Sequence, residues 1–149
     1  MELKIQLHDP NAILPSRTGE DEVGYDLTAI KFNKRLSNNT FMYDTGISVE
    51  PPKGYYVEII PRSSIVKSGY ILGNSIGIID PSYRGTLKIV LIKVSDDKRP
   101  AFAGKEAPLV VPFTLCQLVI RKMNIFPIKV VKELESTYRG NGGFGSTNK

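Results

Sequence analysis

The chain has 149 residues, which fits a single domain large enough to bury its own core. Hydrophobic residues make up 41% and charged residues 23%, a composition that excludes a disordered or fibrous protein. No apolar run is long enough to span a bilayer, and the N-terminus MELKIQLHD is too polar and acidic for a secretory signal. We therefore expect an intracellular protein, in the cytoplasm or nucleus, that does not contact membranes.

The net charge of +5 would suit nucleic acid, an anionic surface or polyphosphate. The basic residues are spread along the chain with no block of five or more, which makes nucleic acid the least favoured partner. Cys116 is the only cysteine, so no intrachain disulfide can form, and its apolar neighbours predict a small buried hydrophobe rather than a nucleophile. His8, the only histidine, falls on a polar strand face, where we expect a solvated residue and no metal ligand.

Short strand patterns follow one another along most of the chain. Residues 3–8 alternate apolar and polar side chains, and residues 86–94 are nearly continuously apolar, which is typical of a central strand. Strands are predicted over residues 3–8, 24–32, 40–49, 55–61, 76–79, 86–94 and 109–126. Gly46 interrupts the pattern of residues 40–49, and residues 109–126 hold one or two strands, broken at Pro112. Residues 62–69 indicate a loop or one helical turn, and residues 95–108 a long surface loop.

Many short strands separated by Gly and Pro, with no helical period, predict an all-β, antiparallel fold of the sandwich or barrel type. We expect one domain over residues 1–149, with a core of about 1–126. From residue 127 the strand pattern fades, and the glycines of STYRGNGGFGSTNK predict a flexible C-terminal arm at 127–149.

The stretch GNSIGIIDPSYRG, residues 73–85, places a carboxylate, an aromatic ring, a cation and an amide around the end of one strand. Rigid strand ends of this kind suit binding sites. The alternative interpretation is an ordinary hairpin corner, since Pro81, Ser82 and Gly85 are common turn residues.

Polar clusters interrupt the strands at five places. They are Asp26; Arg62, Ser63 and Ser64; Asn74, Asp80 and Tyr83; Gln117; and the run RGNGGFGST from Arg139 to Thr147. Glycine-rich backbone, hydroxyls and arginines suit phosphate oxygens, because exposed N–H groups and guanidinium groups both bind anions. The last run, taken alone, could instead be an RNA-binding tail of the RGG type.

In order and spacing these clusters resemble the five motifs of the trimeric dUTPase family. The matching stretches are VGYDLTA, PRSSI, GNSIGIIDPSYRG, CQLVI and RGNGGFGST. The resemblance implies a dUTPase-like β-clip or jelly-roll fold and a homotrimer with shared sites. It also implies Mg²⁺-dependent hydrolysis of dUTP to dUMP and pyrophosphate, which limits uracil in DNA and supplies dUMP for dTMP synthesis.

The resemblance also implies roles for individual residues. Asp80 would be the base that activates the attacking water, and Tyr83 would pack on the deoxyribose and exclude a 2′-hydroxyl. Asn74 and the backbone of Ile78 and Ile79 would read the uracil. The implied catalytic set is Asp80, Gln117 and Arg62. The implied substrate contacts are Arg62, Ser63, Ser64, Asn74, Gly77, Ile78, Ile79, Asp80, Tyr83, Lys88, Gln117, Arg139, Phe144, Gly145 and Ser146.

Three further roles follow from the same resemblance. Arg62, Ser63, Ser64 and Gln117 would hold the phosphates and the attacking water. Asp26 would meet Mg²⁺ through water, since this ion keeps much of its hydration shell and takes ligands from phosphates. On the arm, Arg139 would reach the γ-phosphate and Phe144 would stack on the uracil.

The chain departs from the family pattern at Ser82, where a second acid is usual, and at Val23 and Cys116, where alanine is common. A dCTP deaminase-type relative is the closest alternative, but that family carries a glutamate near the position of Val90. Residues 86–94 contain no acid. A non-catalytic binding module on the same fold is the other alternative.

Overall fold

The computed structural model describes residues 1–94 and 108–146. Its regular elements are β1 (Lys4–Leu7), β2 (Tyr25–Ala29), β3 (Lys31–Ser37), β4 (Thr40–Asp44), β5 (Ile47–Glu50), β6 (Tyr55–Pro61), the 3-10 turn η1 (Ser63–Lys67), β7 (Tyr70–Leu72), β8 (Gly77–Ile79), β9 (Lys88–Lys93) and β10 (Phe113–Lys122). The single helical turn predicted for residues 62–69 is confirmed by η1. Within the described ranges there is no helix long and apolar enough to cross a membrane.

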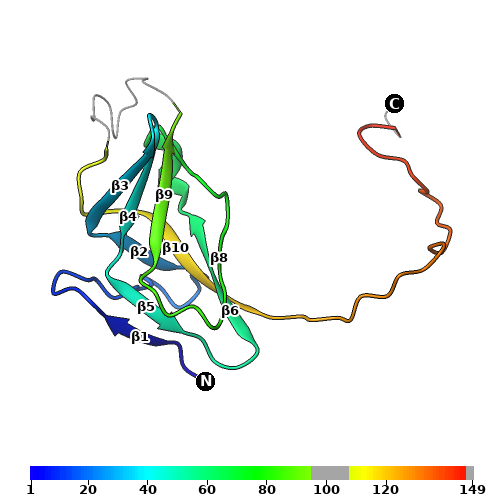
Figure 1. The fold of residues 1–149 in the computed structure, drawn as a ribbon, viewed down its shortest axis with the longest axis horizontal. Helices are drawn as coiled ribbons and strands as arrows, with labels where there is room; N and C mark the ends of the chain where they lie inside the picture. Colours follow the sequence, from blue (N-terminus) through cyan, green and yellow to red (C-terminus); the bar gives the residue numbers. More distant parts are fainter. Residues whose placement is uncertain (95–107, 147–149) are drawn as a thin grey trace.

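The strands form two four-stranded sheets and a small two-stranded sheet, all paired antiparallel (Figure 1). One large sheet has the order β2-β10-β6-β8 and the other β3-β4-β9-β7, while β1 pairs with β5. The predicted all-β antiparallel fold is therefore confirmed. The apolar run at β9 lies between β4 and β7, as a central strand should.

The core lies between the two large sheets, where apolar side chains from both inner faces meet. Its fully buried members include Leu27, Phe41, Tyr43, Val57, Leu87, Ile89, Leu91 and Leu118. The Tyr43 and Phe113 rings meet edge-on with centroids 4.7 Å apart, which joins β4 to β10 across the two sheets. Cys116 is also buried here, and desolvation raises the pKa of its thiol to about 12, which confirms an inert hydrophobe.

Two expected strands are each divided by a change of sheet. Residues 24–32 were expected as one strand, but β2 pairs with β10 and β3 pairs with β4, so the chain crosses between sheets at Ile30. Residues 40–49 divide at Gly46, whose φ of +70° is a conformation that side chains disfavour. The interruption expected at Gly46 is confirmed, whereas the alternation of residues 24–32 continues through Ile30 and does not reveal the crossing there.

The stretch 73–85 also connects the two sheets rather than forming a simple hairpin. β7 pairs with β9 in one sheet, whereas β8 pairs with β6 in the other. The hairpin-corner interpretation of the turn after Asp80 is therefore wrong, because β8 and β9 are not hydrogen-bonded neighbours. Asp80 stands at the end of β8, where the chain leaves one sheet for the other.

Beyond β10 the described residues form no further helix or strand up to residue 146, and Figure 1 shows this segment extending away from the body. We call residues 123–146 the arm. It begins at Met123, whose N–H donates to the carbonyl of Gly54 at 2.8 Å. Several apolar side chains on it are more than three-quarters exposed, namely Ile125, Phe126, Ile128, Val130 and Leu134.

Candidate active site

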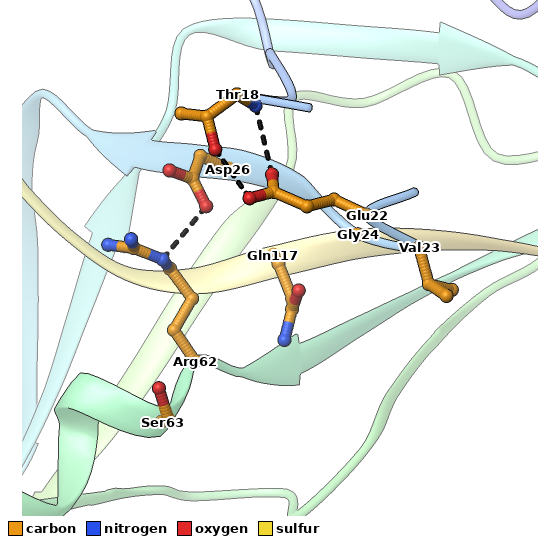
Figure 2. A pocket seen from close by; sticks show the side chains of 8 residues that line it. All are labelled: Thr18, Glu22, Val23, Gly24, Asp26, Arg62, Ser63 and Gln117. Carbon is orange, nitrogen blue, oxygen red and sulfur yellow. Dashed lines mark hydrogen bonds and ion pairs between the residues drawn. The ribbon is translucent and has the colours of Figure 1, made fainter. Parts of the chain in front are cut away.

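Three neighbouring strands bring polar side chains together at one end of the β2-β10-β6 sheet. Gln117 on β10 lies opposite Asp26 of β2 on one side and opposite Ile60 of β6 on the other. Arg62 directly follows the end of β6. These groups line a hollow of about 270 Å³, shown in Figure 2, which we call the polar hollow. Its lining residues are Thr18, Glu22, Val23, Gly24, Asp26, Arg62, Ser63 and Gln117.

Arg62 is fixed by contacts on three of its atoms. Its Nε atom lies 2.8 Å from Asp26 Oδ1, and its Nη1 donates to the carbonyl of Thr114 at 2.7 Å. Its backbone N–H donates to the carbonyl of Leu115 at 2.8 Å. The guanidinium group therefore has a defined orientation at the hollow, which is what bidentate recognition of a phosphate requires.

The two serines after Arg62 differ in their surroundings. Ser63 is exposed and lines the polar hollow. The hydroxyl oxygen of Ser64 is buried and has no hydrogen-bond partner among the described residues. An unpaired buried hydroxyl is unfavourable by about 1–3 kcal/mol, so Ser64 is a candidate for contact with a bound ligand.

One wall of the polar hollow comes from a loop that the sequence did not identify as functional. The Glu22 carboxylate accepts hydrogen bonds from the backbone N–H and the hydroxyl of Thr18, the former at 2.9 Å. These bonds lower the pKa of Glu22, so the group is ionised at neutral pH. The only sequence signal was an acidic cluster in a Gly- and Pro-containing loop, which is more often a solvated surface.

Asp80 does not line the polar hollow. It is exposed and lies instead in a second hollow of about 390 Å³, whose lining residues are Tyr56, Ile78, Asp80, Pro81, Lys122, Met123, Asn124 and Ile125. Within one chain the expected base is therefore separate from the groups expected to bind phosphate.

The residues expected to read the base lie on β8 and, for Asn74, on the turn between β7 and β8. Gly77 and Ile79 pair with Ile59 and Val57 of β6, which fixes the register of this short strand. The Asn74 side-chain nitrogen lies so close to Gly77 that a methyl group added there would come within 3.2 Å of it. The amide group of Asn74 thus lies beside the backbone of β8.

Tyr83 is held in place after the turn. Its backbone N–H donates to the carbonyl of Asp80 at 3.0 Å, and its hydroxyl donates to the carbonyl of Thr86 at 3.1 Å. The ring remains 42% exposed, so one face is available for a ligand. The Tyr83 ring can lie in this position because residue 85 is a glycine. A Cβ atom at residue 85 would lie 2.4 Å from the Tyr83 hydroxyl oxygen and collide with it.

Lys88 lies apart from the polar hollow. Its Nζ atom is 2.7 Å from Asp44 Oδ2, and it also donates to the carbonyl of Thr86 at 3.3 Å. Burial alone would raise the pKa of Asp44, but Lys88 and hydrogen bonds from Gly46 and Thr86 outweigh it and lower the pKa. The substrate contact expected for Lys88 stays a prediction.

None of the arm's expected ligand groups lines either hollow, and the arm itself extends away from the sheets (Figure 1). Arg139 Nε donates to the carbonyl of Gly142 at 2.7 Å, and the N–H of Ser146 donates to the carbonyl of Gly143 at 3.0 Å. Phe144 is fully exposed and, like Gly145, has a positive φ. Thr147 lies outside the described residues. Substrate contacts by these groups stay predictions.

The donor set at the polar hollow fits a magnesium ion that keeps most of its water. The described residues contain no group of three or more His, Cys, Asp or Glu side chains that could enclose a metal. Asp26 supplies a carboxylate at the hollow, and one oxygen of this carboxylate, Oδ1, forms an ion pair with Arg62. One carboxylate suits Mg²⁺ bound chiefly by substrate phosphates and water.

Comparisons with known proteins find relatives over nearly the whole chain. The sequence profile of the dUTPase family matches residues 10–148. A deoxyuridine 5′-triphosphate nucleotidohydrolase of Escherichia phage T5 is 36% identical, with 97% of both chains covered. The enzyme of the same description from the cyanobacterium Picosynechococcus is 35% identical, with 99% of both chains covered. A mutant dUTPase of Staphylococcus bacteriophage 80alpha with dUpNHpp superposes with a TM-score of 0.80, is 25% identical and covers 98% of each chain.

These matches define a hydrolase of nucleotide metabolism. The chain belongs to the dUTPase family. It is accordingly an enzyme, a dUTP diphosphatase.

Proposed function

We propose that the enzyme hydrolyses dUTP at the α-phosphate, releasing dUMP and pyrophosphate. The observation that carries this proposal is that Asp26 on β2, Gln117 on β10 and Arg62, directly after β6, line one polar hollow. A guanidinium group, serine hydroxyls and a carboxamide are donors suited to a triphosphate, and phosphoryl transfer is mostly positioning and charge stabilisation.

In the reaction, Asp80 accepts a proton from the attacking water as the water oxygen bonds to the α-phosphorus. The bond from the α-phosphorus to the bridging oxygen breaks, and pyrophosphate leaves. Gln117 orients the water, while Arg62 and Ser63 hold the phosphate oxygens. Mg²⁺, when bound beside Asp26, supplies charge neutralisation for the triphosphate.

Selection for the deoxyribose and uracil rests on the 73–85 stretch. The Tyr83 ring occupies the space that a 2′-hydroxyl would need. Asn74 and the backbone of Ile78 and Ile79 pair with the uracil edge. The fixed register of β8 on β6 supports this assignment, because a base can be read only by groups in a constant position.

We further propose a homotrimer in which different copies complete each site. Asp80 and the polar hollow are separate within one chain, and the arm leaves its own body (Figure 1). The exposed apolar side chains of Ile125, Ile128 and Val130 are 80%, 96% and 93% exposed, so each needs another surface to cover it. Closure of Arg139, Phe144, Gly145 and Ser146 over a neighbouring copy's site would then exclude water from the phosphates.

The test is pyrophosphate release from dUTP, compared with dTTP, dCTP and UTP, with and without Mg²⁺. We expect turnover of dUTP alone and its loss on chelation. Release of ammonia from dCTP would support the deaminase alternative, and binding without turnover would support the non-catalytic module. Light scattering should give three times the chain mass, and a stable monomer at micromolar concentration would contradict the shared site. The same proposal has three further parts: the enzyme limits uracil in DNA, supplies dUMP for dTMP synthesis and acts inside the cell.

A further inference from the structure

Gly24, at the edge of the polar hollow, is a glycine that its own backbone does not require. The described glycines with positive φ are Gly46, Gly54, Gly69, Gly140 and Gly145, and Gly24 is not one of them. An alanine could therefore adopt the backbone conformation found at position 24. The reason for a glycine at this position must be space rather than conformation.

The side chain of Gln117 fills the space where a side chain at position 24 would lie. A Cβ atom built on Gly24 would come within 1.9 Å of Gln117 Oε1, 2.6 Å of its Cδ and 3.1 Å of its Cγ. Rotating the carboxamide would move Oε1 but would leave Cδ in place, still far inside contact distance. Relief requires rotation about χ1 or χ2 of Gln117, which moves the carboxamide out of its position.

Gln117 is held from the opposite side as well. Its Nε2 atom donates to the carbonyl of Pro61 at 3.0 Å, at the end of β6. The carboxamide thus lies between the backbone before β2 and the backbone at the end of β6, beside Arg62 (Figure 2). Moving it away from position 24 would also strain or break the bond to Pro61.

We infer that Gly24 is a positioning residue for the reaction. Because it has no side chain, the Gln117 carboxamide can occupy its observed position in the polar hollow. This inference rests on the role proposed for Gln117, which orients the attacking water. A side chain at position 24 should therefore have the kinetic effect of losing Gln117, although residue 24 itself touches no reacting atom.

A double-mutant cycle with Gly24→Ala, Gln117→Ala and the two combined tests whether Gly24 acts by leaving space for Gln117. We expect each single variant to lower kcat for dUTP at least about tenfold, with a smaller change in KM. The double variant should be no slower than Gln117→Ala alone, because alanine at 117 no longer occupies the space. If the two losses multiply instead, Gly24 acts independently of Gln117 and the inference is wrong.

Gly19→Ala is the matched control, since it lies in the same loop and an added Cβ would meet only Glu22 Cγ at 4.0 Å. It should keep wild-type kcat and melting temperature. If Gly24→Ala folds poorly, adding Gln117→Ala should restore the melting temperature. Failure to restore it would contradict the inference that Gly24 leaves space for Gln117. If Gln117→Ala keeps full activity, the proposed role of Gln117 fails. A crystal structure of Gly24→Ala then tests independently whether a side chain at position 24 displaces Gln117. An unmoved Gln117 would refute the inference.

Discussion

Arg62 Nε lies 2.8 Å from Asp26 Oδ1, so a cation and an anion stand side by side in the hollow expected to receive a triphosphate. The two side chains are 34% and 33% exposed, and ion pairs this open to solvent contribute about 0–1 kcal/mol to stability. We therefore expect the Arg62–Asp26 pair to affect ligand binding more than folding stability.

Asp26→Asn should raise the Mg²⁺ concentration needed for half-maximal activity, because the amide is a poorer partner for the ion's bound water. The free energy of unfolding should change by less than about 1 kcal/mol. Activity titrated with Mg²⁺, together with urea unfolding, measures both quantities. An unchanged Mg²⁺ requirement would remove Asp26 from the metal site.

Asp80→Asn should turn over dUTP at least about a hundredfold more slowly while still binding it, the scale expected for loss of a general base. Single-turnover kinetics and binding of a non-hydrolysable dUTP analogue separate the two effects. Ser82→Ala, in the same exposed turn, should keep wild-type turnover. Near-normal turnover of Asp80→Asn would exclude Asp80 as the base.

Tyr83→Ala should lower the preference for dUTP over UTP, measured as the ratio of their kcat/KM values. Tyr83→Phe is the matched control: it loses the hydrogen bond to Thr86 but keeps the ring, so it should keep most of the preference. An unchanged ratio in Tyr83→Ala would refute steric exclusion of the 2′-hydroxyl.

Truncation after Tyr138 should leave the melting temperature and the trimer unchanged but greatly reduce turnover. The removed residues include Phe144, whose ring is fully exposed and so adds nothing to the core. Phe144→Ala should act in the same direction more mildly. Unfolding of the truncated protein, or its dissociation to monomers, would show that the segment is structural instead.

Lys88→Met separates a structural role from substrate binding. Because the folded pKa of Asp44 lies below its ordinary value of 3.8, the Lys88 pair stabilises the protein above that pH, and the contribution is lost as pH falls through the folded pKa. Lys88→Met should therefore lower stability at pH 7 by about 1–3 kcal/mol and shift acid unfolding to higher pH.

The measurements are urea unfolding between pH 7 and 3 and KM for dUTP. Lys34→Met on the exposed strand β3 serves as control and should change neither. A raised KM with unchanged stability would instead support the substrate contact expected for Lys88.

Strands with strong apolar patterns could be predicted from the sequence, and β6 and β9 lie close to their expected bounds. β3 could not be predicted, because all seven of its residues are exposed and it forms by pairing with β4. Gly46 marked a break in the strand pattern, but the change of sheet there, like the one at Ile30, depends on tertiary pairing, which a local pattern does not contain.

Residues that were selected for their side-chain type, namely Asp26, Arg62 and Gln117, do line one hollow, and their roles there stay predictions. The site was not predictable where shape alone matters. Thr18 and Glu22 form a wall through bonds to each other, and at Gly24 a side chain would collide with Gln117. Such contributions become visible only when the neighbours in space are known.

The arm is joined covalently to the body through β10, and this attachment determines its local concentration. A tethered segment encounters a site on the same assembly at an effective concentration of about millimolar for short flexible linkers. Closure should therefore be independent of protein concentration for as long as the copies stay together. A free peptide of residues 137–146, added to the truncated enzyme, should restore turnover only at comparably high concentration, because it lacks the tether.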